Sequence, residues 1–127
     1  PLRVAKQNTT DLNKAGYMSV GEAKNIPLFL RLIRSAQPWL AVIDTALPPG
    51  NISDLADIIE NDNLAAAIYI NTTSVTLDRY VQLNWPVEEA VITAVAGAVC
   101  TEFARKKMMY KKITTLRNKL DELISRF

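Results

Sequence analysis

The sequence contains no histidine and a single cysteine, Cys100. The lack of histidine excludes Ser-His-Asp triads, histidine phosphoacceptors and histidine metal ligands. One cysteine allows neither an internal disulfide nor a cysteine-rich zinc site. Glycine is also scarce, with four in the chain and none near Lys6-Gln7-Asn8, where a phosphate-binding loop would follow a first strand. An enzyme of this composition would depend on carboxylates, lysines or hydroxyls, and we expect a non-catalytic protein.

Long apolar runs are lacking as well. No run is long enough to cross a bilayer, and no basic start followed by an apolar stretch resembles a signal peptide. Cys100 lies in an Ala/Val-rich helical pattern, which favours buried packing over reactivity. We therefore expect a cytoplasmic protein without membrane contact.

The charge is unevenly distributed along the 127 residues. Residues 1–99 carry seven Lys/Arg and ten Asp/Glu, a net charge of −3, whereas residues 100–127 carry eight and three, a net charge of +5. A basic tail on an acidic body indicates either nucleic-acid contact or a solvated helix surface. The solvated surface is the simpler interpretation.

Apolar runs alternate with helical patterns over most of the chain. Strands are predicted at Leu2–Ala5, Met18–Ala23, Trp39–Ile43 and Ala65–Ile70. Helices are predicted at Asp11–Ala15, Ile26–Ile33 and Ser53–Ile59, the last with Ser53 as N-cap. A final helix is opened by Pro86 in its first turn and continues without a break to Phe127. This alternation predicts a doubly wound parallel sheet of the α/β class. In such sheets functional residues gather at the carboxyl ends of the strands, where Asp44 and Asn71-Thr72 stand.

The last predicted helix changes its periodicity halfway. Its second half has apolar residues at alternating spacings of four and three: Met109, Ile113, Leu116, Leu120, Leu123 and Phe127. This is a heptad seam with Ile113, Leu120 and Phe127 at a positions, a pattern that favours a parallel two-stranded coiled coil. We predict that residues 104–127 dimerise; the alternative is a helix folded back on its own domain.

Several segments, taken in order, resemble the receiver domain of two-component response regulators. Val42-Ile43-Asp44, followed by Leu47-Pro48 and Gly50, resembles the third strand with its phosphoacceptor aspartate. Ile70-Asn71-Thr72 resembles the fourth strand with its switch hydroxyl, and Trp85-Pro86 resembles the Lys-Pro junction before the last helix. The resemblance implies a flavodoxin-like fold over residues 1–103.

Gly16-Tyr17, Val20-Gly21-Glu22-Ala23 and the extended last helix are most similar to the ANTAR group of these regulators. In that group a receiver is joined to a coiled coil and a small RNA-binding module that acts in transcription antitermination. The resemblance implies a homodimer, a sensor kinase or regulatory protein as partner, and RNA binding only through an output domain absent from these residues.

Departures from the family pattern concern the phosphorylation site. A working receiver uses two acidic residues after the first strand, with the phosphoacceptor aspartate, to hold Mg²⁺. The corresponding stretch here is Lys6-Gln7-Asn8, with Gln7 and Asn8 at the metal-pocket positions, and Trp85 replaces the family's lysine. The switch position holds Asn71, or Thr72 if the alignment shifts by one residue. We therefore predict a pseudo-receiver without a cofactor, in which Asp44 is retained at the phosphoacceptor position.

Two alternatives remain open. One is a competent receiver that accepts phosphate at Asp44, with Mg²⁺ held by Asn8 and backbone groups. The other is a small α/β ligand-binding protein or enzyme. Two segments are also shorter than in the family. They are the segment before Ala15, which would form the first helix, and the segment between Thr72 and Trp85, which would hold a fourth helix and a fifth strand.

Overall fold

The computed structural model describes residues 9–48, 51–73, 77 and 79–126. The predicted strand Leu2–Ala5, the metal-pocket positions Gln7 and Asn8, and Phe127 lie outside the described residues. Within the described part, three parallel strands form one sheet in the order β1-β2-β3. The strands are β1 (Leu40–Asp44), β2 (Ala66–Asn71) and β3 (Gln82–Asn84).

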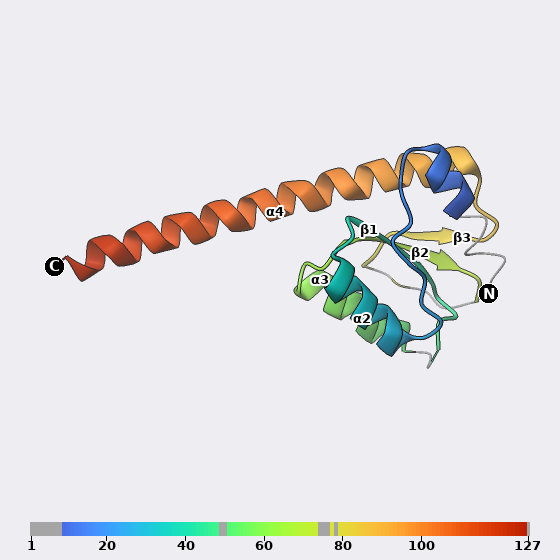
Figure 1. Ribbon diagram of the computed structural model, residues 1–127, viewed down its shortest axis with the longest axis horizontal. Helices are drawn as coiled ribbons and strands as arrows, with labels where there is room; N and C mark the ends of the chain where they lie inside the picture. The colour runs from blue at the N-terminus through green and yellow to red at the C-terminus, as the bar shows by residue number, and fades with distance from the viewer. Residues whose placement is uncertain (1–8, 49–50, 74–76, 78, 127) are drawn as a thin grey trace.

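In the part of the chain that the structure describes, four helical segments accompany this sheet. They are a short helix over residues 9–14, α2 (Ile26–Ala36), α3 (Ile52–Asn61) and α4 (Glu89–Ser125). Helices α2 and α3 lie on one side of the sheet, and α4 with the short helix lies on the other (Figure 1). The chain has the α/β, flavodoxin-like fold, so the predicted fold class is confirmed.

Alternation along the strands builds a separate core on each face of the sheet. Tyr69 of β2 packs with Ile43 of β1 against the α2 and α3 side, where Leu55 is fully buried. Its neighbours Ile68 and Ile70 face the other way, toward α4. Successive strand residues point to opposite faces, so strands that are apolar throughout are covered on both sides.

The core beneath α4 is formed by one stripe of that helix. Ile92 and Ala96, one turn apart, are fully buried against Ile68 and Ile70, and Leu12 of the short helix completes the cluster. Cys100 lies further along α4 and is half-buried. Burial raises the pKa of its thiol, which is consistent with a packing role.

The two helices on the other face begin at asparagine caps. The side chain of Asn25 accepts a hydrogen bond of 2.9 Å from the Leu28 N–H at the start of α2. Asn51 caps α3 in the same way, through the N–H of Asp54 at 3.4 Å. The prediction of Ser53 as the cap was therefore wrong by two residues, because asparagine caps a helix as well as serine does.

The predicted strand Met18–Ala23 was also wrong, because these residues form no regular structure. Met18 is 89% exposed and Val20 is 59% exposed. Gly21 has φ +152°, and a Cβ added there would lie 3.0 Å from Leu32 Cδ2. An apolar pattern alone does not form a strand when no neighbouring strand pairs with it.

The region before α4 differs from the prediction in detail. A cis peptide bond joins Trp85 and Pro86, and the helix begins at Glu89 instead of including Pro86 in its first turn. Among the described residues between β2 and β3, namely 72, 73, 77 and 79–81, none is helical. The three-residue β3 lies where the resemblance implies a fifth strand, between Thr72 and Trp85.

Helix α4 extends far past the body of the molecule (Figure 1). It has 37 residues, which is about 55 Å of helix. Phe103 is buried, whereas all residues from Arg105 to Arg126 are exposed. No helix in the described part of the chain has an apolar stretch that could span a membrane.

Candidate functional site

The polar residues at the ends of β1 and β2 meet at one edge of the sheet. Asp44 and Asn71 are the last residues of their strands. The strands are parallel, with Asp44 paired in register with Ile70. Residues that follow the two strands are therefore brought side by side, as predicted for the carboxyl edge of a doubly wound sheet.

The Asp44 carboxylate accepts hydrogen bonds from both strand ends. Its Oδ1 atom accepts from the Thr72 hydroxyl at 2.5 Å and from the Ala46 N–H at 2.9 Å. Partial burial raises the pKa of Asp44, whereas the hydrogen bonds from Thr72 and Ala46 lower it, and the resulting pKa is below its ordinary value. Asp44 is therefore ionised at neutral pH.

A second set of polar contacts surrounds Asn71. Its Oδ1 accepts from the Thr45 hydroxyl at 3.5 Å and from the Thr73 N–H at 3.2 Å, and its Nδ2 donates to Asn84 Oδ1 at 3.1 Å. The hydroxyls of Thr45 and Thr73 lie 3.3 Å apart. These contacts connect the carboxyl ends of all three strands into one polar cluster.

The two candidates for the switch position make different contacts in this cluster. Thr72 is the residue whose hydroxyl reaches Asp44, while the Asn71 amide contacts Thr45 and Asn84. Trp85 follows β3, and its N–H donates to the Asn71 carbonyl at 3.1 Å. The half-buried Trp85 side chain packs with the core cluster beneath α4.

Sequence reasoning missed Thr45, Thr73 and Asn84. For Thr45 and Thr73 the available signal was their place shortly after the end of a predicted strand. No such signal marks Asn84, because no strand was predicted before it. Asp11 was missed as well: together with Thr45 it is one of two buried polar side chains among the described residues. No periodic pattern marks an aspartate in the first turn of a short helix as buried.

The described residues contain no group of three or more His, Cys, Asp or Glu side chains placed to hold a metal ion. The cluster around Asp44 is formed mainly by hydroxyls and amides. Of these side chains, Thr72 donates to the Asp44 carboxylate, at Oδ1.

The predicted heptad seam lies on the projecting half of α4, and its described members are exposed. Leu116 is 65% exposed and Leu120 is 56% exposed, with Met109, Ile113 and Leu123 close to half exposed. The projecting part of α4, residues 105–126, is about 30 Å long. The alternative in which α4 folds back on its own domain is not the observed arrangement (Figure 1).

Aromatic contacts hold α4 where it leaves the body. The rings of Trp39 and Phe103 meet edge to face, with centroids 5.7 Å apart. Lys107 Nζ lies 5.2 Å from the Trp39 centroid and 5.1 Å from that of Phe103. The predicted domain boundary between residues 103 and 104 falls inside this continuous helix, at the level of these contacts, and stays a prediction.

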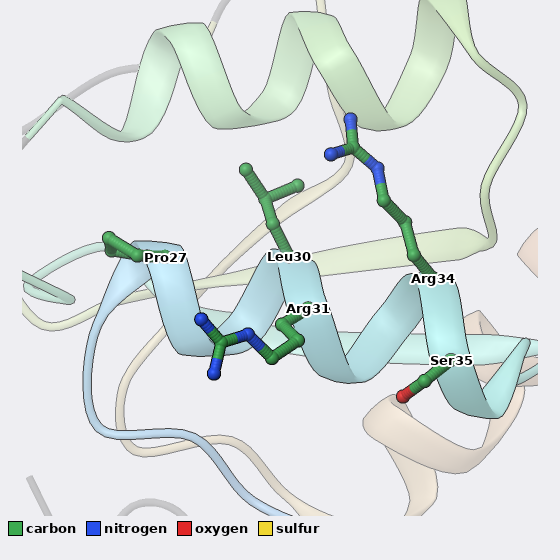
Figure 2. Close-up of a pocket in the computed structure, with 5 residues that line it drawn as sticks. All are labelled: Pro27, Leu30, Arg31, Arg34 and Ser35. Carbon is green, nitrogen blue, oxygen red and sulfur yellow. The ribbon is translucent and has the colours of Figure 1, made fainter.

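A surface hollow of about 590 Å³ lies beside α2 (Figure 2). It is lined by Pro27, Leu30, Arg31, Arg34 and Ser35. Leu30 and Arg34 point toward α3, and Arg34 forms an ion pair of 3.8 Å with Asp62. The hollow shares no residue with the Asp44 cluster.

Comparison with known proteins identifies the fold. No family model and no curated protein matches the sequence. Among solved structures, the chain is similar to the signal receiver domain of a protein described as a LuxO repressor from Vibrio parahaemolyticus. The TM-score is 0.70 at 14% identity, over 85% of this chain and 89% of that chain. The chain therefore has the fold of a signal receiver domain.

Proposed function

We propose that this chain is a non-catalytic regulatory module of signal transduction, a pseudo-receiver that dimerises through the projecting half of α4. The receiver fold supports the signalling role. Its partner is a sensor kinase or another regulatory protein. By resemblance to the ANTAR group, its output is an RNA-binding antitermination module outside these residues.

The observation that carries the pseudo-receiver proposal is the environment of Asp44. Its carboxylate is bound by the Thr72 hydroxyl and the Ala46 N–H, and hydroxyls and amides form the neighbouring cluster. Phosphoryl transfer to an aspartate needs cations to neutralise the developing charge on the phosphoryl oxygens. The sequence has Trp85 where the family has its lysine, and Gln7 and Asn8 at the metal-pocket positions.

Dimerisation is supported by the exposed seam. Five described apolar side chains, Met109, Ile113, Leu116, Leu120 and Leu123, follow a heptad spacing on a helix that projects into solvent. Burying each of them in a partner helix removes apolar surface from water, a gain of about 25 cal/mol per Å². A parallel two-stranded coil is the arrangement favoured by Ile and Leu at these positions.

Incubation with a small phosphodonor and Mg²⁺ tests the pseudo-receiver proposal. We expect the intact mass to stay unchanged both in the protein and in Asp44→Asn. A phosphorylated species that is absent from Asp44→Asn would contradict the proposal. It would support the second candidate function, a competent receiver, which is favoured by one observation: Asp44 is ionised at a strand end beside a threonine hydroxyl.

A further inference from the structure

The g positions that flank the α4 seam are all basic, and none of its described e and g positions is acidic. With Ile113 and Leu120 at a positions, each g position is occupied by a cation: Arg105, Lys112, Lys119 and Arg126. The e positions of the projecting helix are Tyr110, Arg117 and Ile124. In a coiled coil these positions border the seam and set the choice of partner.

Among the described residues, the ion pairs that α4 forms along this flank lie at its two ends. Glu102 pairs with Arg105 at 2.6 Å, and Glu122 is 3.8 Å from Arg126. In the described chain no ion pair involves the central cations Lys112, Arg117 and Lys119. Three positive charges without an ion pair among the described residues therefore border the middle of the exposed seam.

A homodimer brings these charges together. In a parallel coil a g residue faces the e residue of the next heptad on the other helix, so Lys112 faces Arg117 of the second copy. In an antiparallel coil g residues face g residues, and all of these are cationic. The parallel homodimer therefore has fewer like-charge contacts than the antiparallel one, but it retains those between Lys112 and Arg117 at its centre.

We propose that the α4 seam takes a second amphipathic helix whose flanking positions are acidic, and that this helix displaces the second copy from the homodimer. The inference rests on the proposed role of the seam as a coiled-coil surface. Acidic e and g residues on the partner pair with Lys112, Arg117 and Lys119, and its own Ile/Leu seam covers that of α4. Such differences in flanking charge are how coiled coils select one partner over another.

The apolar seam is the reason why the partner is a helix and not only a polyanion. Leu116, Leu120 and Ile113 lie between the charged flanks and are about half exposed or more. A phosphate backbone or a disordered acidic peptide neutralises the flanks but leaves this stripe in water. An acidic helix with its own seam satisfies both features.

Matched peptides added to the intact protein test this proposal. The acidic probe has the sequence of residues 102–126 with Lys112→Glu, Arg117→Glu and Ile124→Glu, so that it faces the three central cations. The control probe has the native sequence of residues 102–126. We expect the acidic probe to bind about tenfold more tightly than the control, from several flanking pairs gained and repulsions removed. The difference should shrink as salt is added.

Two further controls distinguish the contribution of the flanking charges from that of the apolar seam. A charge-reversed protein, Lys112→Glu with Arg117→Glu, should prefer the native-sequence probe. An acidic probe that also carries Leu116→Asn and Leu120→Asn should not bind. Polyglutamate or a single-stranded oligonucleotide that binds as tightly as the acidic probe would overturn the proposal in favour of a polyanion.

The mass of the protein without peptide distinguishes the remaining outcomes. A protein that self-associates but binds both probes equally overturns this inference and leaves the homodimer proposal intact. A monomeric protein that binds neither probe overturns both proposals. Displacement of the second copy by the acidic probe, giving a complex of one protein with one peptide, is the result we expect.

Discussion

Thr72 donates a hydrogen bond of 2.5 Å to Asp44 and thereby joins the carboxyl ends of β2 and β1. The same carboxylate oxygen accepts the N–H of Ala46. In this structure Asp44, which the sequence predicts at the phosphoacceptor position, is therefore a link between two strands of the sheet.

Replacing Thr72 tests this link. Thr72→Val removes the hydroxyl donor at similar volume, so we expect the pKa of Asp44 to rise and the protein to lose about 1 kcal/mol of unfolding free energy. Thr72→Ser keeps a hydroxyl, so it should retain most of the lowered Asp44 pKa and most of the unfolding free energy. Carboxyl NMR titration and urea unfolding measure the two effects. An unchanged Asp44 pKa in Thr72→Val would show that the hydrogen bond is unimportant.

The lowered pKa of Asp44 also predicts how stability depends on pH. Its folded pKa lies below the ordinary value of 3.8, so near and below that pH the unfolded chain binds more protons and stability rises with pH. The contribution of Asp44 is complete above its ordinary pKa and is lost as the pH falls through the lowered folded value.

Urea unfolding of the protein and of Asp44→Asn over a pH series checks this dependence. The difference in unfolding free energy between the two should be constant near neutral pH and should shrink below about pH 4. A difference that does not change with pH would contradict the assignment of a lowered pKa to Asp44.

The contact of α4 with the sheet depends on Ile92, which is fully buried beside Ile68 and Ile70 of β2. Ile92→Ala should lower the unfolding free energy by about 2–5 kcal/mol, because it leaves a cavity in the core. The neighbouring Val91 is 42% exposed, so Val91→Ala should cost less than about 1 kcal/mol. Equal losses of unfolding free energy in the two variants would contradict the observed orientation of α4, in which Ile92 faces the sheet and Val91 does not.

Sedimentation equilibrium tests the proposed coil. The double substitution Leu116→Lys with Leu120→Lys puts charges into the seam, and we expect a monomeric mass beside a dimeric parent. Thr114→Lys with Asn118→Lys adds the same charge at exposed positions outside the seam and should remain dimeric. A monomeric parent protein would defeat the dimer proposal.

The fold could be predicted because β1 and β2 are continuous apolar runs that end in polar residues. Apolarity on both faces is the signal of a strand covered on both sides, and the two cores confirm it. The segment Met18–Ala23 shows the limit of this reasoning. Its local pattern is compatible with a strand, but strand formation requires a hydrogen-bonded neighbour, which local sequence does not specify.

The site was predictable to the extent that strand ends determine it. Asp44, Asn71 and Thr72 could be placed at one sheet edge from the predicted strands alone. The choice between Asn71 and Thr72 depends on which side chain points along the edge toward Asp44, and that requires the strand register. Asn84 was not predictable, because β3 has only three residues and no apolar run marks it.

The central claim, that Asp44 is not a working phosphoacceptor, is tested most directly by titration with Mg²⁺ and then beryllofluoride, a mimic of aspartyl phosphate. Tryptophan fluorescence reports the change, since Trp85 follows β3 and its N–H donates to the carbonyl of Asn71 in the polar cluster. We predict no saturable response at millimolar Mg²⁺. A saturable, Mg²⁺-dependent response that is lost in Asp44→Asn would contradict the account and establish a competent receiver.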